Sequence, residues 1–169
     1  MSDIHDSIHD EDLDYEDHRD ILDAVTLKTH QKTNSNISGE ITVLENGYVE
    51  VLLTTTPDMV VDDMGLIHGG FVFSAADYAA MAAVNEQNVV LVACNCQFLS
   101  PVKLRDEVRV TAKLRHKEGK KRNVHVEAYV LDIKVFEGDF NTVITERHVL
   151  KLKLLDDEDA QLNGQSEIF

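Results

Sequence analysis

The stretch from His68 to about Asn85 is the feature that most constrains the fold of this 169-residue chain. Two glycines open it, and most later positions hold alanine, valine, phenylalanine or methionine with no polar face. A helix that is apolar on every side is a buried helix, and its many alanines allow a sheet to approach closely. No other stretch predicts a helix as clearly, so we expect one long buried helix to organise the fold.

Strand-like runs lie on both sides of this helix. Before it, Asn46-Gly47 separates two short runs, which is a strong hairpin signal. After it come runs at 89–98, 107–115, 123–131 and about 135–149. The run at 89–98 is apolar on both faces, as in a central strand, whereas 107–115 and 123–131 alternate with Val108, Val110, Val124 and Val126 among the inward residues.

About six strands and one helix predict an α+β fold, an antiparallel sheet curled round a single helix. A doubly wound sheet would need more helices. Such a sheet leaves a free edge and an incompletely buried face. We therefore expect a dimer, most simply by joining two sheets edge to edge.

Charge divides the chain into three parts. Residues 1–23 hold ten acids and one arginine, a net charge of −9 out of −15 for the whole chain. We expect residues 1–37 to form an acidic N-terminal segment, disordered or loosely helical, with the polar stretch 29–38 as a linker. Residues 38–155 would form the folded domain, and 156–169 an acidic disordered tail.

Composition also excludes several classes of protein. No apolar run approaches the ~20 residues that a membrane span needs, and the acidic N-terminus is unlike a signal peptide. An acidic surface argues against nucleic-acid binding. Cys94 and Cys96 cannot form a disulfide framework, and their spacing is poor for zinc. We expect a soluble cytoplasmic protein with no metal site.

Two features of the helix could carry chemistry. Asp77 is an acid among apolar residues, where a buried carboxylate is costly unless paired; it is either a functional group or a structural one bonded to backbone or a tyrosine hydroxyl. His68-Gly69-Gly70 opens the helix, where exposed N–H groups suit a thioester carbonyl that develops negative charge. The alternative there is a tight entry turn with a capping histidine.

The spacing between His68 and Asp77 keeps these two features apart. Nine helical residues rise roughly 13.5 Å and turn through about 900°. The two therefore lie on opposite sides of one helix and cannot converge on one substrate atom. If both act, they act from different subunits across a dimer interface.

The segment HGGFVFSAAD at 68–77 resembles the HGG-x6-D signature of PaaI-like hotdog-fold acyl-CoA thioesterases. TTTPDM at 54–59 and FLSP at 98–101 are also similar, and the likeness spans about residues 41–149. The resemblance implies a hotdog fold, a homodimer or a dimer of dimers, and acyl-CoA as the ligand with no other cofactor. It implies Asp77 as nucleophile or general base, and Gly69 and Gly70 of the partner subunit, beside His68, as donors to the thioester carbonyl. Phe71 would be among the apolar residues at the acyl chain.

One position departs from this pattern. Members of the family often carry an Asn about six residues before the HGG histidine, where this chain has Asp62. An ionised carboxylate only accepts hydrogen bonds. We place Asp62 at the substrate, but as a residue that cannot donate to the carbonyl oxygen.

The second half also resembles the malonyl-CoA-sensing effector domains of bacterial fatty-acid-synthesis repressors, through VHVEAYV at 124–130 and VFEGDF at 135–140. Those domains carry Asn where Asp77 stands, and a DNA-binding module precedes them. The acidic segment here is too short and of the wrong charge to replace that module. Two functions are therefore open: an acyl-CoA thioesterase, or a non-catalytic acyl-CoA-binding or sensing protein with a regulatory role. Failing both, the chain would be a scaffold whose acidic segment binds a partner.

Basic residues gather in one part of this acidic chain. Residues 103–122 contain nine Lys or Arg and three acids. The phosphates of CoA suit such side chains, so we expect Lys120, Lys121 and Arg122, just beyond a turn, to contact the ligand. The alternative is a solvated strand face.

Overall fold

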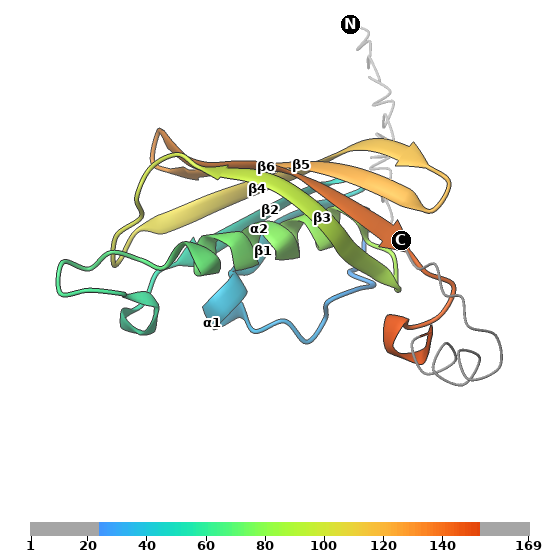
Figure 1. The fold of residues 1–169 in the computed structure, drawn as a ribbon, viewed down its shortest axis with the longest axis horizontal. Coiled ribbons are helices and arrows are strands. Elements are labelled where there is room, and N and C mark those ends of the chain that lie inside the picture. Colours follow the sequence, from blue (N-terminus) through green and yellow to red (C-terminus); the bar gives the residue numbers. More distant parts are fainter. Residues whose placement is uncertain (1–23, 153–169) are drawn as a thin grey trace, which may run out of the picture.

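The computed structural model describes residues 24–152. It contains a six-stranded sheet in the order β1-β2-β4-β5-β6-β3, in which every pair of neighbours runs antiparallel. The long helix α2 packs against one face of this sheet, and the short helix α1 lies on the far side of α2 (Figure 1). The predicted α+β architecture is confirmed. The expectations for residues 1–23 and for the tail at 156–169 lie outside the described residues.

The elements follow one another as the sequence indicates. In chain order they are α1 (Ser35–Ser38), β1 (Glu40–Glu45), β2 (Tyr48–Thr54), a 3-10 turn (Pro57–Met59), α2 (Gly69–Val84), β3 (Val89–Phe98), β4 (Glu107–Glu118), β5 (Lys121–Val130) and β6 (Ile133–Ile144).

The hairpin at Asn46-Gly47 forms as predicted. Glu45 of β1 pairs with Tyr48 of β2 across the two-residue turn. Gly47 has a φ of 79°, a left-handed conformation that glycine adopts without a Cβ clash. The turn chemistry therefore sets the register of the first two strands.

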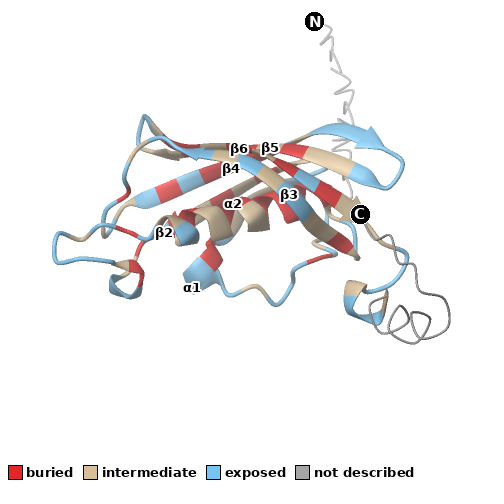
Figure 2. Ribbon diagram, in the orientation of Figure 1, coloured by how far each residue is buried: buried red, intermediate tan, exposed pale blue. Residues whose placement is uncertain are grey.

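The core lies between α2 and the inner face of the sheet (Figure 2). The predicted inward residues of β4 and β5 are buried there: Val108, Val110, Ala112, Val124, Val126 and Ala128 are fully inaccessible to solvent. Alanines at Ala75, Ala76, Ala79 and Ala80 are equally buried on α2. Small residues on the helix against valines on the strands allow the close approach that the composition predicted.

The position of β3 corrects one expectation. Its uncharged sequence VVLVACNCQF predicted a central strand, but β3 stands at the edge of the sheet and pairs only with β6. Much of the strand is half-buried or exposed (Figure 2). A strand with the composition of a sheet centre therefore lies at a free edge of the described chain.

Two further boundaries differ from the prediction. The last strand ends at Ile144 rather than near residue 149, and a helical turn begins at Val149. The polar stretch expected to be a linker contains α1, whose Asn34 cap accepts from the Asn36 N–H at 3.0 Å. Ser38 is buried, and its hydroxyl lies 2.7 Å from that of Ser74 on α2. The stretch is therefore packed against the helix.

Candidate functional site

Helix α2 begins at the predicted His68-Gly69-Gly70 segment. His68 is the N-cap, and its ring nitrogen Nδ1 accepts a hydrogen bond from the Gly70 N–H at 2.9 Å. Because Nδ1 accepts, the proton of the neutral ring is on Nε2. The ring also meets Phe71 edge-on, with 6.1 Å between the centroids. His68 is therefore the capping residue that the sequence offered as an alternative. Its ring binds the Gly70 N–H, which is one of the two backbone donors expected to face a ligand.

The Gly69 N–H is the donor that remains. It has no hydrogen-bond partner among the described residues. A Cβ at this position would lie 3.1 Å from the ring of Phe98, so only glycine lets the helix start approach this ring without displacing it. A backbone donor at a helix N-terminus is suited to an oxygen that carries negative charge.

A pocket of about 320 Å³ lies beside Gly69. Its lining is mainly apolar and comes from the helix start, from the end of β3 with the segment after it, and from β6: Ile67, Gly69, Val72, Phe98, Leu99, Ser100, Pro101, Val102 and Val135. The FLSP segment noted in the sequence is therefore part of this wall. Phe98 and Leu99 are 56% and 45% exposed, an unusual share for residues of this kind.

Asp77 lies two turns further along α2. Its Oδ1 is buried and has no hydrogen-bond partner among residues 24–152. Burial raises the pKa of the Asp77 carboxyl to about 6 from the ordinary value of 3.8. If Asp77 were a structural residue bonded to backbone or to a tyrosine hydroxyl, this oxygen would have a hydrogen-bond partner. Residues 24–152 supply none for it.

Asp77 faces the free edge of the sheet. Phe73, one turn earlier on α2, stacks on Phe140 of β6 at 5.6 Å. Phe140 pairs with Cys94 on β3, and the negative charge of Asp77 contributes to the raised pKa of the Cys94 thiol, after burial and the neighbouring Cys96. The carboxyl group therefore lies between α2 and the edge strand.

Asp77 and the Gly69 N–H do not meet within one chain. They are eight residues apart on one regular helix, which corresponds to about 12 Å of rise. The sequence predicts that two subunits are needed to bring these groups together. The geometry of the helix favours this prediction.

Asp62 has a role in the loop before α2. Its Oδ1 accepts from the backbone N–H groups of Met64 and Leu66, both at 3.0 Å. The carboxylate closes a turn whose tip, Met64, is 89% exposed. The contact of Asp62 with a substrate is not visible in these bonds and stays a prediction.

The predicted basic residues at the β4–β5 turn do not converge. Lys120 pairs with Glu146 at 2.7 Å, and the Arg122 guanidinium donates to the carbonyls of Gly119 and Lys121. Lys121 and Arg122 do line a hollow of about 310 Å³, which also contains Val92. Lys120 and Arg122 therefore use part of their hydrogen-bonding capacity on neighbouring residues, and the Arg122 bonds hold the turn. The predicted contact of these residues with a ligand stays a prediction.

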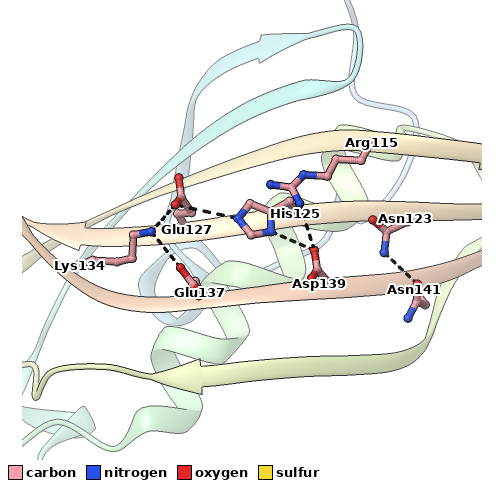
Figure 3. Close-up of polar contacts among 8 residues, drawn as sticks. All are labelled: Arg115, Asn123, His125, Glu127, Lys134, Glu137, Asp139 and Asn141. Atoms are coloured by element: carbon pink, nitrogen blue, oxygen red, sulfur yellow. Dashed lines mark hydrogen bonds and ion pairs between the residues drawn. The ribbon is translucent and has the colours of Figure 1, made fainter.

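A polar network covers the outer face of the sheet, opposite α2 (Figure 3). His125 Nδ1 lies 2.9 Å from Asp139, and Lys134 bonds both Glu127 and Glu137. These residues come from the two segments that resemble the repressor effector domains. Since Val124, Val126 and Ala128 alternate with them toward the core, the network lies away from Asp77.

Two features are absent from residues 24–152. No group of three or more His, Cys, Asp or Glu side chains there is arranged to hold a metal ion. No helix in this part of the chain is both long and apolar enough to cross a membrane.

Comparison with known proteins defines the class. Residues 64–137, which hold the helix, the edge strand and much of β4 and β5, match the family described as the thioesterase superfamily. A crystal structure of an uncharacterized protein from Pyrococcus horikoshii is 44% identical with a TM-score of 0.74, over 75% of this chain and 97% of that one. Over residues 64–137 the chain resembles the thioesterase superfamily, and the hotdog fold expected from the sequence is confirmed.

The similar proteins of known name include an isomerase and a transcription factor. A methylthioribose-1-phosphate isomerase of Aquifex aeolicus is 50% identical over 117 residues, which are 69% of this chain but only 26% of that protein. The transcription factor FapR of Thermoanaerobacter sp. is 28% identical over 79% of this chain and 69% of its own length. This match confirms the resemblance to the repressors of fatty-acid synthesis.

Two solved structures share the fold at lower identity. The Escherichia coli PaaI protein is 24% identical with a TM-score of 0.62, over 69% of this chain and 88% of its own. A hypothetical thioesterase from Streptococcus pneumoniae, solved with coenzyme A, is 20% identical with a TM-score of 0.59, over 64% of this chain and 87% of its own. At these identities the likeness concerns the fold.

Proposed function

We propose that this protein hydrolyses an acyl-CoA thioester at a site shared by two subunits. The observation that carries the proposal is the half-buried Asp77, whose inaccessible Oδ1 has no hydrogen-bond partner among the described residues and whose pKa is raised to about 6. Enzymes of this superfamily act on thioesters, and one structural neighbour was solved with coenzyme A. Groups with such perturbed titration concentrate at functional sites.

The dimer is proposed on the properties of β3. Ten residues without a single charge form an edge strand, and its outer backbone groups have no strand beside them in the described chain. Proteins usually protect such an edge with charges, prolines or a cover, because it pairs readily with another strand. A second copy of β3 satisfies those groups and continues the sheet into the partner.

Antiparallel pairing of two β3 strands would bring the required groups together. Gly69 lies beside Phe98 at the end of β3, and Asp77 lies near Cys94 in its middle. Since a two-fold axis reverses one strand against the other, the Phe98 end of one subunit crosses the edge toward the partner. The Gly69 N–H of one subunit then approaches the Asp77 carboxylate of the other.

The chemistry follows from these two groups. The thioester carbonyl oxygen accepts from the Gly69 N–H, which stabilises the negative charge of the tetrahedral intermediate. The ionised Asp77 either attacks the carbonyl carbon itself or takes a proton from the water that attacks it. The carbon–sulfur bond then breaks, and the CoA sulfur leaves as a thiol after receiving a proton. The apolar pocket beside Gly69, near Phe71, accommodates the acyl group.

Release of free thiol from a panel of acyl-CoA thioesters tests the proposal. Asp77→Asn keeps the shape of the side chain but removes the base, so turnover is expected to fall by more than about 100-fold. Asp132→Asn, at the exposed β5–β6 turn, is the matched control and should retain full turnover. Undiminished hydrolysis by the Asp77 variant would remove the catalytic assignment.

A second candidate function is a non-catalytic acyl-CoA-binding or sensing protein. The observation that favours it is that few hydrogen-bond donors remain for a thioester carbonyl. His68 accepts from the Gly70 N–H, and Asp62 accepts from N–H groups of its own loop. The FapR relatives make a regulatory role a reasonable alternative. This function predicts tight binding of a non-hydrolysable acyl-CoA analogue in calorimetry with no thiol released from any substrate in the panel.

A further inference from the structure

A basic groove lies at the end of α2 that is opposite to Gly69. It measures about 800 Å³, and its lining contains four permanent positive charges, two histidines and no carboxylate. The residues are Lys28, Thr29, His30, Gln31, Lys32, Gln87, Asn88, Arg147, His148 and Lys151. Its two walls, residues 28–32 and 147–151, are remote in sequence and lie near the end of α2 in Figure 1.

Hydrogen bonds hold both walls in place. On one side, Asn85 ends α2 in a left-handed conformation and its side chain binds the backbone of Thr26 and Lys28, at 2.9 and 2.7 Å. On the other side, Thr145 donates through its N–H and its hydroxyl to the Asn88 carbonyl, at 3.1 and 3.2 Å. Both walls of the groove are therefore fixed by hydrogen bonds to the loop that follows α2.

Within residues 24–152, the positive side chains of the groove have no ion-pair partner at salt-bridge distance. Two acids adjoin the lining in sequence, Glu86 beside Gln87 and Glu146 beside Arg147, and Glu146 pairs with Lys120. The C-terminal end of a helix supplies only about half a negative charge. Such a concentration of positive charge in a chain of net charge −15 attracts a multiply charged anion.

The groove continues toward the proposed active site. A second hollow of about 290 Å³ shares Thr29, Asn88 and His148 with it and adds Val89 and Val90 at the start of β3. In the antiparallel dimer proposed above, this end of β3 lies toward the Phe98 end of the partner strand. An extended ligand with phosphates in the groove could therefore reach the partner's helix start.

We propose that the basic groove between residues 28–32 and 147–151 binds the phosphate groups of the ligand, while the contact predicted for Lys120, Lys121 and Arg122 stays a prediction. That these phosphates belong to the same molecule as the thioester rests on the proposed function. Lys28 and Lys32 contribute from one wall, Arg147 and Lys151 from the other. Lys and Arg are the side chains that bind phosphate oxygens most strongly.

Binding of inorganic pyrophosphate and of CoA, measured by calorimetry on the full chain carrying Asp77→Asn, tests the groove without turnover. Lys28→Gln with Arg147→Gln removes one charge from each wall, and both Kd values should rise at least about tenfold. Arg109→Gln with Lys113→Gln is the control. It removes the same charge from exposed positions on β4, and the Kd values should change less than about twofold.

The arms of the experiment separate the possible results. Pyrophosphate that competes with CoA places the phosphates of CoA in the groove, whereas pyrophosphate that binds there without displacing CoA assigns the groove to a separate phosphorylated ligand. Equal binding by the groove variant and the control would overturn the proposal. Hydrolysis of an acyl-pantetheine, which lacks phosphates, tests the thioesterase chemistry independently, so either proposal can fail alone.

Discussion

At the scale of single residues, Asp77 links stability to function. Its pKa is raised from 3.8 to about 6, so the folded state binds a proton more tightly than the unfolded state. Stability contributed by this group is present below about pH 4 and is lost as the pH rises through 6. The ionised carboxylate, which the proposed hydrolysis requires, therefore destabilises the folded protein at neutral pH.

Asp77→Asn should consequently stabilise the protein. Above pH 7 the free energy of unfolding is expected to increase by about 1–3 kcal/mol, because the neutral amide avoids the cost of burying a charge. Urea unfolding at about pH 8 measures the gain, which should shrink toward zero at about pH 3.5. Asp132→Asn should show no such pH dependence. A variant less stable than the parent at pH 8 would mean that the carboxylate has a stabilising partner in the assembled protein.

Gly69 allows a second test at this scale. Gly69→Ala adds a methyl group 3.1 Å from the exposed ring of Phe98, which has room to move. The free energy of unfolding should change by less than about 1 kcal/mol, while kcat/KM for an acyl-CoA should fall at least about tenfold because the methyl group crowds the N–H donor. Thermal unfolding and thiol release measure the two effects. Unchanged kcat/KM would exclude this N–H from catalysis.

The burial of Asp77 follows from the sequence, whereas the local bonds of His68 and Asp62 do not. Asp77 could be predicted, because an acid within an apolar helix is costly wherever the strands lie. The hydrogen bond from the Gly70 N–H to His68 depends on the rotamer of the histidine ring. The hydrogen bond from the Leu66 N–H to Asp62 depends on the geometry of the loop. Neither is encoded in residue spacing. The basic groove was missed because Lys28 and Arg147 are more than one hundred positions apart.

At the scale of elements, Asn85 shows how one helix end organises a distant segment. Asn85→Gly keeps the left-handed conformation, since glycine adopts it readily, but removes both bonds to Thr26 and Lys28. We expect amide hydrogen exchange of residues 26–33 to speed up at least about tenfold while β4 and β5 stay protected. Asn88→Gly, in the same loop, is the control. Equal protection in Asn85→Gly and the parent would show that other contacts hold the segment.

The same elements explain where sequence patterns failed. The run at 89–98 has the composition of a buried strand but lies at an edge of the sheet. This composition fits the covered position that β3 takes in the proposed dimer. The stretch 29–38 is polar along its length, yet Thr29 and Ser38 are buried. Two buried positions in ten produce no periodicity, so the packing of this stretch had no sequence signal.

At the scale of the whole molecule, the two edges of the sheet differ in kind. The edge strand β1 has Glu40 and Glu45 at its ends, which discourages pairing, whereas β3 has no charge and carries the exposed Val92. The asymmetry favours β3 as the edge for the proposed self-association. A two-fold dimer formed there contains two equivalent sites, each with Asp77 from one subunit and Gly69 from the other.

Mixing two inactive variants tests this sharing of residues. Asp77→Asn damages one half of each site and Gly69→Val the other half. In a mixed dimer one site carries both changes and the other carries neither, so equal amounts of the two variants should recover about a quarter of the parent activity after exchange of subunits. Thiol release before and after mixing measures the recovery.

A third variant shows whether the recovery depends on the β3 edge. Val92→Lys places a charge on the edge strand, so it should give a monomer in sedimentation experiments, and it should abolish recovery when introduced into both partners. Lys113→Gln introduced in the same way leaves the edge unchanged and should preserve recovery. If mixing restores nothing although mixed dimers form, then Asp77 and Gly69 act within one chain or do not act together, and the helix spacing of about 12 Å leaves only the second of these.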